Sequence, residues 1–315
     1  MASTRRRKHM QSNNSKTYEL VLTALFVAII VVMASTPLGY IPLVVINATT
    51  LHIPVIIGSL FLGPKKGACL GGVFGITSFI KSSLTPTPSA FAFSPVAALT
   101  MLSHDTVGQA IGLVFKSTFI AIVPRILIGV VPYFVYVGIK KAISSEKKVV
   151  YGSVINVIIS FIMGFGVFAF FNKMISEGKV GFSVTAAQVI GAVVGIAVFV
   201  AIEYLFMNKD AKALGFITAG ISGAMTNTLL VMGSIYAFYR IPYAEVLQID
   251  PSALMGVIGG IISFNGVIEA IVGAVIVYLV GIVLDKIKPA GVYSGKKSEK
   301  VQAVSEVKTS EQMAN

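Results

Sequence analysis

Long runs of apolar residues recur along this chain from residue 20 to residue 284, and they limit what it can fold into more than any other feature. Of the 315 residues, 55% are hydrophobic and 12% are charged, which is too little polarity to cover a soluble domain. Runs of this length satisfy their backbone hydrogen bonds within a bilayer as helices. We therefore expect an all-α fold, a polytopic membrane helical bundle.

The apolar runs predict eight membrane spans. They lie at about residues 18–35, 51–63, 66–80, 113–139, 150–171, 184–207, 213–238 and 253–284. The second and third spans are short and are joined by the tight turn "GPKKG".

The basic residues predict the orientation of these spans. The net charge of +12 could suggest a nucleic-acid partner, but most of the lysines and arginines flank the apolar runs. With the N-terminus inside, nineteen of them fall in inner segments and four in outer segments. Cytoplasmic loops carry such an excess, so both termini are expected in the cytoplasm and no nucleic acid is expected as partner.

Two of the outer connections are uncharged and rich in proline, namely residues 37–47 and 82–101. Apolar outer loops do not behave as solvated linkers. They can fold back over the bundle as lids, or they can be re-entrant or interfacial segments without a gating role. The sequence does not separate these two interpretations.

Polar side chains within the spans are the candidates for function, because they are costly to place in a bilayer. Arg125 lies in the fourth predicted span, "TNT" (Thr226, Asn227, Thr228) in the seventh, and Asn265 and Glu269 in the last. At about 1.5 Å per residue, these groups lie at similar depth, roughly 18–24 Å below the outer helix ends. Polar groups from three helices at one level favour a buried site for a small molecule.

Each of these residues also has a structural interpretation. Asn and Thr often join membrane helices by hydrogen bonds alone. Glu269 could be protonated, or could neutralise Arg125. His52, at the outer end of the second span, could be interfacial or could contact a ligand, and Glu203 is expected to reach the inner interface.

Small residues spaced four apart predict close helix packing. Gly67, Gly71 and Gly75 are expected to pack inside the bundle, and Ala24 and Ala28 form a similar pair on the first span.

Enzyme chemistry is not indicated. There is no HExxH, no GxSxG and no glycine-rich phosphate loop, and neither a metal site nor a cofactor is expected. Since nothing in the sequence binds ATP, uphill transport would need an ion gradient or a partner.

The motifs "LHIPVIIGSLFLGPKKGA" (51–68), "VPRILIGVVPY" (123–133), "SGAMTNTLLVMG" (222–233) and "NGVIEA" (265–270) resemble the substrate-binding S component of energy-coupling factor (ECF) vitamin transporters, and the pantothenate type most closely. The resemblance covers about residues 17–141 and 211–285.

This resemblance implies a core of six helices that binds one vitamin from outside, beneath lid-like loops. It implies docking on a membrane coupling subunit carried by two cytoplasmic ATPases, with Ala24 and Ala28 at the docking face. Pantothenate has a carboxylate, two hydroxyls and an amide. The guanidinium of Arg125 suits the carboxylate, and Asn227, Asn265, Glu269, Thr226, Thr228 and His52 are the other candidate substrate contacts.

The implied organisation is a basic segment (1–17), core helices (18–141), an inserted helix pair (142–210), further core helices (211–285) and a disordered tail (286–315). The insertion departs from the six-helix pattern and leaves the vitamin in doubt. An S component for another vitamin, a proton-coupled secondary transporter that uses Glu269, and a membrane scaffold remain alternatives.

Overall fold

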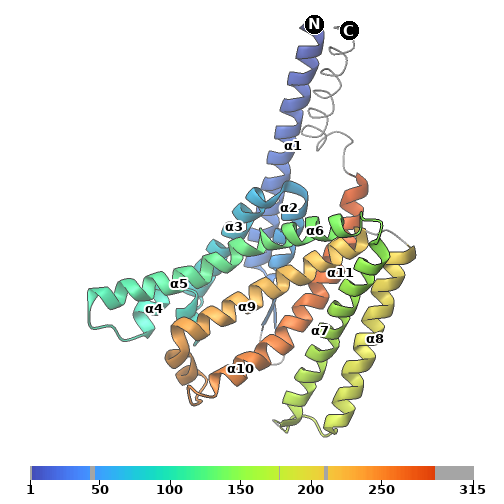
Figure 1. Ribbon diagram of the computed structural model, residues 1–315. Coiled ribbons are helices and arrows are strands. Elements are labelled where there is room, and N and C mark those ends of the chain that lie inside the picture. Colours follow the sequence, from blue (N-terminus) through green and yellow to red (C-terminus); the bar gives the residue numbers. More distant parts are fainter. Residues whose placement is uncertain (1, 43–46, 177, 209–211, 288–315) are drawn as a thin grey trace, which may run out of the picture.

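The computed structural model describes residues 2–42, 47–176, 178–208 and 212–287, and within them the chain is almost entirely helical (Figure 1). The helices are α1 (Ala2–Ser35), α2 (His52–Leu62), α3 (Pro64–Leu84), α4 (Pro95–Met101), α5 (Val107–Ile128), α6 (Val131–Ala142), α7 (Lys148–Ser176), α8 (Val184–Asn208), α9 (Lys212–Val246), α10 (Leu254–Ile261) and α11 (Val267–Ile287). An antiparallel ribbon of β1 (Tyr40–Pro42) and β2 (Asn47–Thr49) is the exception. The prediction of an all-α membrane bundle is confirmed.

Seven helical stretches are long and apolar enough to cross a membrane, with α5 and α6 forming one stretch and α10 and α11 another. The remaining predicted span, residues 51–63, corresponds to α2, which has 11 residues and is buried from His52 to Phe61. At about 16 Å it covers only half of a hydrocarbon core of about 30 Å. The ribbon before α2 supplies non-helical chain inside the bundle, which a membrane protein tolerates where the protein itself covers it.

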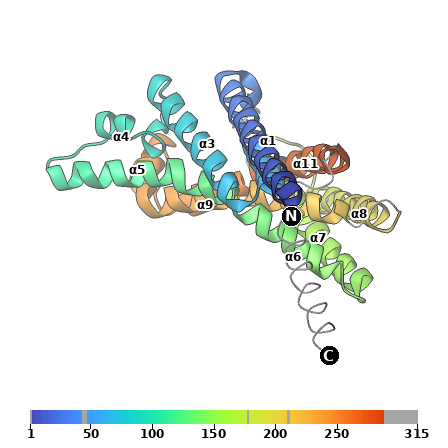
Figure 2. The same cartoon turned by 90° about the horizontal axis from the view of Figure 1, so that it is seen from above.

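The beginning of α1 and the end of α11 lie at the same end of the molecule (Figure 1). This agrees with termini on one side of the membrane, and the cytoplasmic assignment rests on the basic residues. In both views, the hairpin of α7 and α8 lies on the opposite side of the molecule from α4 (Figures 1 and 2). The tail from residue 288 onward lies outside the described residues.

Glycines bring α3 and α5 into backbone contact, as predicted. A β-carbon on Gly67 would collide with the Gly129 carbonyl, and one on Gly71 with the Arg125 carbonyl. At Gly75 it would come within 2.9 Å of the Ala121 carbonyl oxygen. The three glycines therefore fix the position of α5 against α3.

The outer segment 82–101 folds back onto the bundle. Phe91, in a short 3₁₀ turn before α4, is 1% exposed and packs edge-to-face on Tyr239 of α9, with ring centroids 5.3 Å apart. The segment 82–101 therefore packs on the bundle, and its gating role remains a prediction. Of the other proposed lid, residues 37–47, positions 43–46 lie outside the described residues.

The hairpin of α7 and α8 is joined by polar groups near the end that lies away from its loop. Asn156 of α7 donates to Glu203 of α8 at 2.8 Å and to the Phe199 carbonyl at 3.0 Å, and Ser153 donates to the same carboxylate at 2.7 Å. That Glu203, five residues before the end of α8, also reaches the inner interface stays a prediction. The carboxylate turns sideways because α7 offers it two hydrogen-bond donors.

Candidate solute-binding site

Arg125 is buried because Pro124 creates a partner for it inside α5. Pro124 has no N–H, so the carbonyl of Ile120, four residues earlier, lacks its helical donor. Nη1 of Arg125 donates to that oxygen at 2.6 Å. The kink expected at Pro124 therefore has a specific consequence: it anchors a buried guanidinium.

Two aromatic rings face the guanidinium. The Cζ atom of Arg125 lies 5.5 Å from the ring centroid of Phe74 on α3 and 5.3 Å from that of Phe93, in the folded-back outer segment. These are cation–π distances. Phe93 thus links the outer segment directly to the buried cation, a contact that no sequence motif indicates.

Glu269 joins three parts of the chain. Its Oε1 accepts from the backbone N–H of Thr49 in β2 at 2.8 Å, and its Oε2 accepts from the hydroxyl of Thr228 on α9 at 2.9 Å. Glu269 therefore holds the ribbon, α9 and α11 together at the depth predicted for the polar groups.

Asn227 and Asn265 each lie next in sequence to one of two residues, Thr228 and Gly266, that meet where α9 packs on the last span. Asn227 precedes Thr228, and Asn265 precedes Gly266, which packs against the Thr228 methyl group. The two amides are 7% and 6% exposed. Neither Oδ1 atom has a hydrogen-bond partner among the described residues. Buried acceptors without partners are costly and are rare unless a ligand, ion or water satisfies them.

Asn265 lies in a π-helical turn, Ile262–Gly266, between α10 and α11. The sequence predicts one continuous helix over residues 253–284 instead. A π turn contains one extra residue, so the side chains on its two sides are rotated relative to each other by roughly 100°. Such turns often occur at functional sites.

His52 lies deeper than predicted. It is 1% exposed, and its Nε2 lies 3.4 Å from the position that a β-carbon would take on Gly273, one turn inward from Glu269. Neither ring nitrogen has a hydrogen-bond partner of normal geometry among the described residues, and the Thr49 backbone lies close to the ring. The interfacial alternative for His52 is wrong, because the ribbon carries the chain into the bundle before α2 begins.

Thr226 does not join these groups. It is half-buried, and its hydroxyl donates within α9 to the Ser222 carbonyl at 2.6 Å. The hydroxyl of Thr228 is occupied by Glu269. We use the term polar cluster for His52, Arg125, Asn227, Asn265 and Glu269.

The polar cluster has the chemistry of a site for a small polar anion. Arg125 supplies a permanent cation, His52 and the two amides supply donors and acceptors, and aromatic rings lie beside the cation. In ligand sites, a few buried polar groups of these kinds within an apolar lining orient the ligand.

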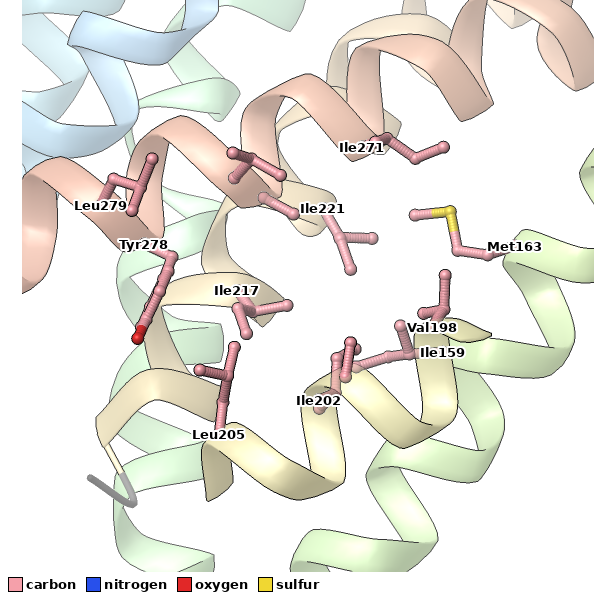
Figure 3. A pocket seen from close by; sticks show the side chains of 13 residues that line it. Ile159, Met163, Val198, Ile202, Leu205, Ile217, Ile221, Ile271, Tyr278 and Leu279 are labelled. Atoms are coloured by element: carbon pink, nitrogen blue, oxygen red, sulfur yellow. The ribbon is translucent and has the colours of Figure 1, made fainter. Parts of the chain in front are cut away.

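A cavity of about 310 Å³ lies elsewhere, among α7, α8, α9 and α11 (Figure 3). Its lining is almost wholly apolar, for example Met163, Val198 and Ile221, and only Tyr278 carries a hydroxyl there. A polar solute would lose its hydrogen bonds to water without replacement in this cavity. We therefore place the candidate site at the polar cluster.

Two bacterial transporters are similar in sequence to this chain. The "Pantothenic acid transporter PanT" of Lactococcus lactis subsp. cremoris is 42% identical over 125 residues, which are 39% of this chain. The chain spans 59% of that protein's length. The "Pantothenate transporter PanT" of Leuconostoc mesenteroides is 26% identical over 277 residues, covering 86% of this chain and 94% of that protein.

This chain is a multi-pass membrane protein. That conclusion combines the seven apolar helices with the similarity to bacterial transporters. No family model matches the chain, and no solved structure matches it.

Proposed function

We propose that this chain binds pantothenate within the membrane, as the substrate-binding subunit of an ATP-driven ECF-type importer. The observation that carries the proposal is the set of buried polar atoms in His52, Asn227 and Asn265 that no described residue satisfies. The buried cation of Arg125 and the similarity to two proteins named as pantothenate transporters support it.

The chemistry of pantothenate fits this cluster. Arg125 would bind the carboxylate, to which a guanidinium can donate two parallel hydrogen bonds. The Asn227 and Asn265 amides and the His52 ring would take the hydroxyls and the amide. Glu269 would hold β2 and α9 in place through Thr49 and Thr228 rather than contact the carboxylate, which it would repel.

The proposed partners are a coupling membrane subunit and two cytoplasmic ATPases. Ala24 and Ala28 of α1 are both exposed, whereas Phe26 and Ile30 on the other face of the helix are buried against α2 and α3. An exposed pair of small residues one turn apart lets another helix approach closely. This favours an external contact over packing within the chain.

Two experiments test the proposal. Calorimetry on the purified chain should show pantothenate binding without ATP. Purification from native membranes should recover the ATPase and coupling subunits. Binding of a different vitamin would replace the substrate and leave the importer assignment in place.

A proton-coupled secondary transporter is the second candidate, because Glu269 is the buried acid among the described residues. Uptake measured with an uncoupler, while cellular ATP is maintained, separates the two. Continued uptake favours the ATP-driven importer, and loss of uptake favours proton coupling through Glu269.

A further inference from the structure

The inserted helix α7 runs alongside the π-helical turn that carries Asn265. Three positions of α7 meet three positions around this turn in antiparallel order. The side chain of Lys173 lies against Gly260, Phe170 stacks on Phe264, and Gly166 lies against Val267. The contacts therefore begin before the turn and end after it.

The central contact is a close aromatic pair. The rings of Phe170 and Phe264 are 4.2 Å apart between centroids and 15° from parallel. Phe264 is the residue before Asn265, so its ring and the Asn265 amide belong to the same five-residue turn. Fixing one ring restricts the rotation of that turn.

The contact on the C-terminal side of the turn leaves no space for a side chain at Gly166. A β-carbon on Gly166 would collide with Cγ2 of Val267, the first residue of α11. Val267, Met163 and Ile159 belong to one hydrophobic core together with Ala224 of α9 and Ala270 of α11. The hairpin is thus packed into the bundle at the level of the polar cluster.

We propose that Phe170 and Gly166 of the inserted hairpin are positioning residues that hold the π-helical turn so that Asn265 faces the substrate. π-helices are rare and occur mostly as single turns inside α-helices, frequently at functional sites. The stack and the Gly166 contact pack against this turn from outside the site. This inference rests on the proposed function and assigns a role to the insertion within it.

The first test is a double-mutant cycle on pantothenate affinity, measured by calorimetry. Phe170→Leu should weaken binding about two- to tenfold, the fold-change that the loss of one aromatic pair allows. Phe170→Tyr, which keeps the ring, should restore it. The loss of affinity caused by Phe170→Leu should vanish when Asn265 is already alanine. It should persist when Asn227 is already alanine.

Phe161→Leu is the matched control, because Phe161 lies on the same helix, is 72% exposed and stacks on Phe165. It should bind as the unmodified chain does. A loss for Phe170→Leu that is equal in both asparagine backgrounds would overturn the inference, since it would indicate a general effect on the bundle. Wild-type affinity in Phe170→Leu would also overturn it and leave the proposed function intact.

The second test needs no ligand, so it remains informative if the chain does not bind pantothenate. Hydrogen exchange of the backbone amides at 262–269 should accelerate in Phe170→Leu and in Gly166→Leu, while exchange at 227–231 stays unchanged. Unchanged exchange at 262–269 would contradict the inference. Absence of pantothenate binding by the unmodified chain would contradict the proposed function instead.

Discussion

Nη1 of Arg125 donates a 2.6 Å hydrogen bond to the carbonyl oxygen of Ile120, the carbonyl that Pro124 leaves without a helical donor. Pro124 therefore leaves the Ile120 carbonyl as a buried acceptor, and Arg125, the next residue, donates to it. This accounts for a permanent cation in a stretch otherwise suited to lipid. It also fixes one end of the guanidinium, whose Cζ atom lies 5.5 Å from the ring centroid of Phe74 and 5.3 Å from that of Phe93.

Replacing Pro124 tests this relationship. Pro124→Ala restores an N–H that competes with Arg125 for the Ile120 carbonyl, so the guanidinium should lose its fixed orientation. We expect about tenfold weaker pantothenate binding, the effect of roughly one charged hydrogen bond, with a melting temperature unchanged or higher because a helix interior prefers alanine. Calorimetry and thermal unfolding measure the two effects. Full affinity in this variant would show that the Ile120 contact does not orient Arg125.

Arg125→Lys separates a carboxylate contact from a charge that only balances Glu269. An ammonium keeps the charge but cannot form two parallel hydrogen bonds. If Arg125 binds the substrate carboxylate, affinity should fall while the melting temperature of the ligand-free protein is retained. A fall in stability with unchanged affinity would support the structural pairing with Glu269.

The amides of Asn227 and Asn265 should each contribute to affinity. Asn227→Ala and Asn265→Ala leave ligand groups unpaired in a buried site, which typically costs about 1–3 kcal/mol, or roughly 5- to 150-fold in affinity. Ser222→Ala is a suitable control, because its hydroxyl donates within α9 to the Ala219 carbonyl. Unchanged affinity in both asparagine variants would return these residues to helix packing.

The exposed pair on α1 should matter for transport and not for binding. Ala24→Trp and Ala28→Trp add bulk to a face that no described helix covers closely, so the purified variants should bind pantothenate as the unmodified chain does. They should fail to assemble with a coupling subunit, and uptake in cells should be lost. Leu25→Trp, also at an exposed position, controls for bulk at the lipid-facing surface. Loss of binding in the alanine variants, or normal uptake, would count against this docking face.

The sequence is sufficient to predict seven of the eight expected spans, and it predicts a common depth for the polar groups; the expected span at 51–63 is too short to cross. Run length determines where a helix can cross, and rise per residue determines depth, so these two quantities alone place Arg125, Thr228 and Glu269 at one level. The glycine spacing at Gly67, Gly71 and Gly75 predicts the close packing that α3 makes with α5.

Other features depend on partners that are distant in the sequence. His52 is deep because the ribbon enters the bundle, and the ribbon is held by Glu269, 220 residues from Thr49. Glu203 turns towards Asn156 because α7 lies beside α8. The π-helical turn has no periodic signature, since a single additional residue within a long apolar run does not change its composition.

The central claim is that the polar cluster binds pantothenate without help from other subunits. Isothermal titration calorimetry of the purified chain in detergent, without ATP, tests it most directly, with Arg125→Lys and Asn265→Ala titrated alongside. We predict saturable binding by the unmodified chain at one site and weaker binding by both variants. No heat and no thermal stabilisation with pantothenate, or equal affinity in all three proteins, would contradict it.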